Sequence, residues 1–312
     1  MKIKNKKYKE YNTILLGGGG LKGIAYVGVF KKLEEIINTR KLSESKENFD
    51  EENCILPKIN IKTICGVSVG SMFGLTYVLG YNYIEMLEEV LTIKFDKFKN
   101  IKIMNFLNNY GLDSGNGFMN WLGNLMIKKG FDKDITFQEL YNKTNIDFQV
   151  MACNLNKYCY TKFNYISTPN VKVLDGVRMS ISIPFVFTTN KYEGDIHVDG
   201  GLIDNYPISQ FHDNLENVLG FKLINHGELK SHQVNEPIND IESYIYHILT
   251  CYVVQKEKHT TRLPEYKKCT VYINTENITH SINFGLSAID KTKLIDVGYI
   301  TTHNFFTTQN QN

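Results

Sequence analysis

A serine between two glycines is the first candidate for chemistry in this 312-residue chain. Residues 66–70 have the sequence Gly-Val-Ser-Val-Gly, which fits the G-x-S-x-G pattern of a nucleophile elbow. Such a motif turns sharply from a strand into a helix, and Gly66 and Gly70 lack the Cβ atoms that would clash in the turn. The hydroxyl of Ser68 would then stand above the sheet as a nucleophile. A plain turn of small residues is the alternative interpretation.

A serine hydroxyl needs a neighbouring base to become a good nucleophile. Residues 198–207, with the sequence Val-Asp-Gly-Gly-Leu-Ile-Asp-Asn-Tyr-Pro, place Asp199 directly before Gly200 and Gly201, after a strand-like run. Asp199 is therefore the candidate base, although an ordinary Asp-Gly turn has the same pattern. Because Asp199 lies far from Ser68 along the chain, the sheet must bring the two side chains together.

Four consecutive glycines at residues 17–20 precede both motifs. Glycines at a helix N-terminus leave backbone N–H groups free to hold one oxyanion, which predicts an oxyanion hole made by Gly18, Gly19 and Gly20. A dinucleotide fingerprint ending at Gly23 is a second interpretation, but the acidic residue expected about 20 positions later is missing. A P-loop would need Ser or Thr after Lys22. A tight strand-to-helix turn needs fewer glycines.

Hydrophobic periodicity predicts the elements that must position these residues. A strand at 11–16 leads into a helix at 25–37, and a strand at 59–65 leads into a helix at 72–79. Two strand–helix units in succession indicate a parallel sheet with helices on its faces. Further predictions are a loop at 40–53, helices at 118–126 and 241–254, strands at 148–153, 159–164, 218–224 and 270–273, and a helix from the Ser287/Asp290 capping box to Phe305.

The chain resembles the patatin-like phospholipases, in which a glycine-rich loop, a G-x-S-x-G serine and a D-G-G aspartate occur in this order. The resemblance extends to residues 136–140, 178–185 and 284–287, and so covers about Tyr11 to Phe306. It implies a three-layer α/β/α sandwich with a mainly parallel central sheet. It also implies a Ser68–Asp199 dyad that acts without histidine, with supporting roles for Lys22, Gly23, Gly66, Gly70, Gly200 and Gly201.

From this resemblance we expect a lipid acyl hydrolase, a phospholipase A-type enzyme or a broader lipid esterase, that works through an acyl-enzyme without metal or cofactor. A histidine triad is the alternative mechanism, because seven histidines follow Asp199, of which His212, His226, His232 and His247 are the first four. His197 would share the face of Asp199 on a strand.

The alternative functions are a nucleotide-binding enzyme that uses the glycine loop as a phosphate cradle, and a catalytically silent interaction protein. An acyl-chain wall, or a packing role, is expected for Ile183, Phe185, Val186 and Phe187.

Composition restricts the partners and the organisation of the chain. A net charge of +2, from 35 basic and 33 acidic residues, excludes bulk nucleic-acid binding, and 42% hydrophobic residues are typical of a globular protein. We expect a basic tail at 1–10 without a signal peptide, a single domain at 11–306 and a tail at 307–312.

The uncharged run 63–84 is expected to be a buried strand and helix rather than a membrane span. An intracellular, cytoplasmic protein that meets lipid at a membrane surface is the resulting expectation.

Overall fold

The structure is a computed structural model that describes residues 9–50, 54, 56–224, 238, 244–245, 247–248, 251–252, 263–275, 278 and 284–309. The first half of the fold contains β1 (Glu10–Leu16), η1 (Gly20–Ile24), α1 (Ala25–Glu44), β2 (Lys58–Val67), α2 (Val69–Val78), α3 (Tyr83–Thr92), η2 (Phe95–Phe98), α4 (Ile103–Asn109), β3 (Gly111–Asp113), α5 (Asn116–Lys128) and α6 (Phe137–Thr144). The second half contains β4 (Asp147–Asn154), β5 (Cys159–Phe163), α7 (Val173–Ser180), β6 (Phe185–Phe187), β7 (Asn190–Tyr192), β8 (Asp195–Asp199), η3 (Gly200–Leu202), η4 (Ile208–Asn217), β9 (Val218–Ile224), α10 (Pro264–Lys268), β10 (Thr270–Asn274) and α11 (Ala288–Gln309).

A mixed, mostly parallel sheet of eight strands forms the centre of the molecule, in the order β10-β9-β1-β2-β4-β8-β7 with β5 also paired to β4. The pairs β10/β9, β9/β1, β1/β2 and β2/β4 are parallel. The pairs β4/β8, β8/β7 and β4/β5 are antiparallel. The carboxyl ends of β1 and β2 lie side by side, with Leu16 opposite Gly66. This edge is where open α/β sheets bind ligands.

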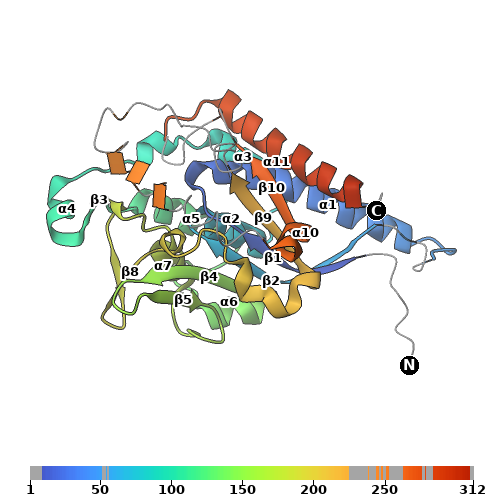
Figure 1. Cartoon of the computed structure of the whole chain (residues 1–312), viewed down its shortest axis with the longest axis horizontal. Helices are drawn as coiled ribbons and strands as arrows, with labels where there is room; N and C mark the ends of the chain where they lie inside the picture. The colour runs from blue at the N-terminus through green and yellow to red at the C-terminus, as the bar shows by residue number, and fades with distance from the viewer. Residues whose placement is uncertain are drawn as a thin grey trace.

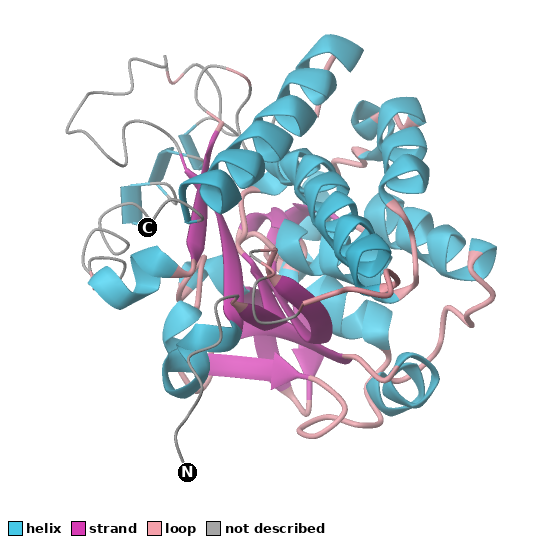
Figure 2. Cartoon of the chain, turned by 90° about the vertical axis from the view of Figure 1, so that its right-hand side faces the viewer, coloured by secondary structure: helices cyan, strands magenta, loops and turns pink. Residues whose placement is uncertain are grey.

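Successive side chains on the strands enter two cores on opposite faces of the sheet. Ile14 and Leu16 of β1 lie in the larger core with side chains of α1, α2, α5, α7 and α11. Leu15 lies in a smaller core with side chains of η4 and α10. Helices therefore cover both faces, and the expected layered α/β fold is confirmed (Figure 2). On the larger side, α11 lies along α1 (Figure 1).

The ends of two predicted helices differ from the structure by several residues. Helix α1 continues to Glu44, into the segment expected to be a loop, because the buried Arg40 donates to the Glu44 carboxylate at 2.7 Å and to the backbone carbonyl of Leu56. Helix α11 continues to Gln309, three residues into the expected tail at 307–312. Most of the predicted helix at 241–254 lies outside the described residues.

Residues 63–84 form the end of β2, the turn at Ser68, helix α2 and the start of α3. This run is therefore a buried strand followed by helices, as its glycines and polar residues predict. Within the described ranges, no helix combines the length and the apolar character needed to cross a bilayer.

Candidate active site

Ser68 occupies the sharp turn between β2 and α2. Its φ of 53° and ψ of −127° are unusual for a non-glycine residue, and such strain persists only where the surrounding structure holds it in place. The flanking glycines are required for close packing. A Cβ atom on Gly66 would lie 2.4 Å from the backbone N of Ser71, and one on Gly70 would lie 2.3 Å from the carbonyl O of Leu16. The turn therefore tolerates only glycine at these two positions.

Asp199 lies at the carboxyl end of β8 and meets Ser68 through the sheet. Strand β4 pairs with both β2 and β8, which brings two segments distant in sequence to the same edge. The Asp199 carboxylate accepts hydrogen bonds from the Ser68 hydroxyl and, at 2.7 Å, from the backbone N–H of Gly201. The backbone N–H of Asp199 donates to the carbonyl O of Ser182 at 2.9 Å, which anchors the end of the strand. The structure thus brings the candidate nucleophile and the candidate base into direct contact.

Burial raises the pKa of Asp199 from 3.8 to about 6. Only 5% of the residue is exposed, so its charged form loses most of its hydration. The hydrogen bonds from Ser68 and Gly201 oppose this effect and lower the pKa, but they are the smaller contributions. A carboxylate with a pKa near 6 is a stronger base than an ordinary aspartate and is still mostly ionised at neutral pH. Asp199 is therefore well suited to accept a proton from Ser68.

The glycine loop lies beside Ser68, but its three predicted donors are not equivalent. The N–H of Gly18 donates to the carbonyl O of Asn205 at 2.9 Å and is therefore not available for an oxyanion. The backbone N–H groups of Gly19 and Gly20 donate to no acceptor within the described part of the chain. Gly20 has a φ of 56°, a conformation that a residue with a side chain rarely adopts. We predicted the N–H of Gly18 as an oxyanion donor; in the structure it instead anchors the glycine loop to Asn205.

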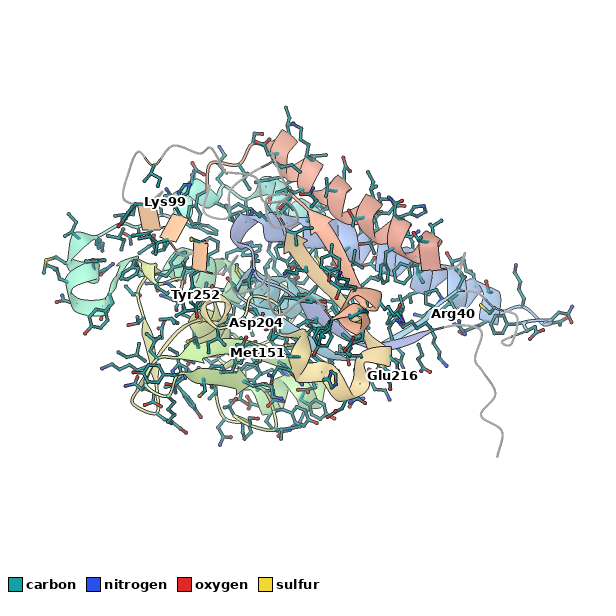
Figure 3. All side chains as sticks on the ribbon, in the orientation of Figure 1. Arg40, Lys99, Met151, Asp204, Glu216 and Tyr252 are labelled. Carbon is teal, nitrogen blue, oxygen red and sulfur yellow. The ribbon has the colours of Figure 1, made fainter. Side chains whose placement is uncertain are left out.

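The supporting residues of the prediction pack around this centre. A Cβ atom on Gly23 would lie 2.4 Å from a side-chain carbon of Val69, and one on Gly200 would lie 2.4 Å from the carbonyl O of Met151. Lys22 lies in η1 with only 5% of its surface exposed. Met151 and Asp204, next to these contacts, are labelled near the middle of the molecule in Figure 3.

An apolar cleft opens onto Ser68. Its remaining lining is Gly20, Leu21, Ile24, Val69, Met72, Phe73, Phe95, Phe118, Trp121, Ile181, Ile183, Phe187 and Phe284. Of the four residues expected to form an acyl-chain wall, Ile183 and Phe187 line this cleft. Val186 lines a neighbouring hollow, and Phe185 is exposed at the surface. The cleft thus places an apolar lining next to a hydroxyl, a carboxylate and two backbone N–H groups.

Comparison with known proteins identifies the family. The model of the patatin-like phospholipases matches residues 14–212, which make up more than half of the chain and contain both Ser68 and Asp199. The chain belongs to this family.

Two viral proteins are among its relatives. An uncharacterized protein of Acanthamoeba polyphaga mimivirus is 28% identical over 296 residues, which cover 93% of this chain and 91% of the relative. A probable lipid hydrolase of Invertebrate iridescent virus 6 is 30% identical over 208 residues, which cover 65% of this chain and 63% of the relative.

Two solved structures share the patatin fold. VipD from Legionella pneumophila matches with a TM-score of 0.55 and 16% identity, covering 96% of this chain and 67% of its own. The type III effector ExoU matches with a TM-score of 0.53 and 11% identity, covering 98% of this chain and 54% of its own. At these identities the likeness concerns the fold.

Two described histidines of this patatin-like chain, His197 and His212, have hydrogen-bond partners outside the dyad. His197 is buried, its Nε2 lies 2.8 Å from the Thr161 hydroxyl, and its Nδ1 lies 3.1 Å from the carbonyl O of Asp195. Burial lowers the pKa of His197. His212 contacts the Tyr266 hydroxyl through Nδ1 at 3.3 Å. His226 and His232 lie outside the described residues, and the described hydrogen bonds of the Asp199 carboxylate come from Ser68 and Gly201 rather than from a histidine.

Two residues that the sequence analysis did not single out hold the site together. The Ser180 hydroxyl accepts a hydrogen bond from the backbone N–H of Ser68 at 2.9 Å and donates to the carbonyl O of Met151 at 2.7 Å. Asn205 accepts from the N–H of Gly18 through its carbonyl O, and its side-chain amide donates to the carbonyl O of Gly18 at 3.1 Å. Both residues fall inside segments that carry the family resemblance, which was the one available signal for them.

Proposed function

We propose that this protein is a serine-dependent lipid acyl hydrolase that uses a Ser68–Asp199 dyad. The hydrogen-bonded pair at the end of an apolar cleft is the observation that carries the proposal. Membership of the patatin-like phospholipase family, and the name of the viral probable lipid hydrolase, support the same class of reaction.

The proposed reaction assigns each step to a group of this site. Ser68 Oγ attacks the carbonyl carbon of an ester while its proton passes to the Asp199 carboxylate. The N–H groups of Gly19 and Gly20 stabilise the oxyanion of the tetrahedral intermediate. Asp199 then returns the proton to the leaving alcohol, which leaves an acyl group on Ser68. In the second half, Asp199 accepts a proton from water, the resulting hydroxide attacks the acyl-enzyme, and the carboxylic acid is released with the proton restored to Ser68.

The cleft favours an acyl chain as the group that sits beside Ser68. The side chains that line the cleft, among them Ile24 and Phe284, are almost wholly apolar. Burial of each methylene group of an acyl chain in such a site contributes about 0.8 kcal/mol to the free energy of binding. A charged or strongly polar acyl group would lose its hydration there without a compensating partner. We therefore propose carboxylic esters of long-chain fatty acids, as in phospholipids, as the substrate class.

Hydrolysis assays of two matched pairs of variants test the proposal. Ser68→Ala and Asp199→Asn should each lower kcat on a fluorogenic fatty-acid ester by at least about a thousandfold, as in other enzymes that lose one member of a catalytic unit. Ser43→Ala, on the surface of α1, and Asp195→Asn, on the same strand as Asp199, should retain activity within about twofold. Near-normal turnover by Ser68→Ala would refute the proposed mechanism.

A further inference from the structure

An exposed apolar surface surrounds α4, and none of the seven residues of this helix is buried. Ile103 is 73% exposed and Leu107 is 65% exposed. We call this region the α4 surface and define it by its large apolar side chains, Ile103, Met104, Phe106, Leu107, Tyr110 and Phe185. The ring of Phe185, from a distant part of the chain, lies 6.4 Å from that of Phe106, so the surface is continuous across two segments. Contiguous exposed apolar patches of this kind mark interaction sites.

The α4 surface is connected to the Ser68 cleft by shared walls. A hollow lined by Ile103, Phe106 and Phe185 shares Leu112 and Ile245 with a second hollow. The second hollow shares its other wall with the cleft itself, through Phe118, Phe187 and Phe284. A row of neighbouring apolar hollows, separated by these shared side chains, therefore lies between the α4 surface and Ser68.

The charges next to the α4 surface are almost all positive. Residues 94–112 contain one acidic residue, Asp96, and four exposed lysines, Lys94, Lys97, Lys99 and Lys102. Figure 1 places α4 at one end of the molecule, and Figure 3 labels Lys99 at that end and Arg40 at the opposite end. Apolar side chains next to lysines bind at the interface of anionic bilayers, because the chains enter the acyl boundary while the ammonium groups meet the head groups.

We propose that the α4 surface docks this protein on an anionic lipid bilayer. Docked in this way, the row of apolar hollows faces the bilayer, and an acyl chain reaches Ser68 by displacing the apolar side chains between the hollows, without crossing water. The path to Ser68 rests on the proposed hydrolase function, whereas binding to the bilayer does not. The lysines favour a bilayer over a second copy of the chain, since residues 94–112 of two copies would bring like charges together.

Vesicle co-sedimentation of the Ser68→Ala protein tests docking without hydrolysis of the vesicles. Vesicles of phosphatidylcholine alone are compared with vesicles that also contain phosphatidylglycerol. The double variant Met104→Ser/Leu107→Ser should lower the partition coefficient at least about tenfold on both kinds of vesicle, because two large apolar side chains no longer insert. Leu42→Ser, at an equally exposed leucine on α1, should bind within about twofold of the parent.

A second variant tests the electrostatic part. Lys97→Gln/Lys102→Gln should lower binding at least about tenfold on vesicles with phosphatidylglycerol and leave the weaker binding to pure phosphatidylcholine unchanged. Unchanged thermal unfolding midpoints show that both double variants are folded, which is expected for substitutions at exposed positions.

Three results would overturn the inference. The first is equal vesicle binding by the parent and by Met104→Ser/Leu107→Ser. The second is loss of binding on deletion of residues 1–8, with their lysines, while the α4 double variant still binds. The third is a dimer that dissociates in the α4 double variant without any vesicle binding, which would assign the surface to a second copy. The hydrolase proposal fails separately, if Ser68→Ala retains ester turnover, and that result would leave vesicle binding intact.

Discussion

Replacing Asp199 with asparagine removes a buried carboxylate while keeping the size and shape of the side chain. The variant should lose hydrolytic activity and gain stability at neutral pH. The asparagine carbonyl can still accept from the N–H of Gly201, and its amide can donate to Ser68, so the local packing remains. Loss of function combined with a gain in stability is the pattern expected of a strained catalytic group.

The magnitude follows from the pKa of Asp199. Folding raises this pKa from 3.8 to about 6, so the folded state favours the protonated form. A difference of about two in pKa corresponds to roughly 3 kcal/mol between the protonation states. This penalty is small below pH 3.8, where the carboxyl group is mostly protonated in both folded and unfolded chains. It grows as the pH rises and is complete above the folded pKa of about 6.

Urea unfolding of the wild type and of Asp199→Asn at a series of pH values from 3.5 to 8 measures this effect. The free energy of unfolding of the variant relative to the wild type should rise by roughly 3 kcal/mol across the series. Asp195→Asn is the matched control of opposite sign. Hydrogen bonds from Lys157 and Asn154 lower the pKa of Asp195, so this substitution should reduce stability near neutrality and have little effect in acid. A difference between wild type and Asp199→Asn that does not change with pH would refute the reasoning.

Three further predictions concern the same site. Ser180→Ala leaves the N–H of Ser68 buried without its acceptor, so urea unfolding should show a loss of about 1–3 kcal/mol and kcat should fall at least about tenfold. Gly20→Ala introduces a side chain at a φ of 56°, which should cost about 1–2 kcal/mol in unfolding free energy and lower kcat more than it raises KM. In the wild type, kcat/KM should rise with pH through about 6, because Asp199 must be ionised to accept a proton; a flat profile between pH 5 and 7 would contradict this role.

Local motifs predicted much of the fold and of the site because their chemistry is local. The strand, the sharp turn and the helix around Ser68 follow from two glycines and from apolar periodicity within about a dozen residues. The Ser287/Asp290 capping box likewise starts α11, with the Asp290 N–H donating to the Ser287 hydroxyl at 3.1 Å. Such signals depend on neighbours in sequence, and the sequence therefore contains them.

Contacts between distant segments were harder to predict. The acceptor of the Gly18 N–H is Asn205, and no local pattern reveals that the loop and the Asp199 segment touch. The Ser180 hydroxyl supports Ser68 from a helix more than a hundred residues away in sequence. The end of α1 depends on Arg40 reaching Leu56 across the following loop. In each case the deciding partner is fixed by the packing of the sheet and helices, which composition and spacing do not specify.

Reaction with a fluorophosphonate probe, followed by peptide mass spectrometry, tests the central claim most directly. The probe reacts covalently with an activated serine, and we expect one modified site, Ser68, with labelling slowed strongly in Asp199→Asn. Ser71, which lies nearby but donates its hydroxyl to the carbonyl O of Ser68, should remain unmodified. Labelling of another serine, or labelling of Ser68 at the same rate in Asp199→Asn, would contradict the account.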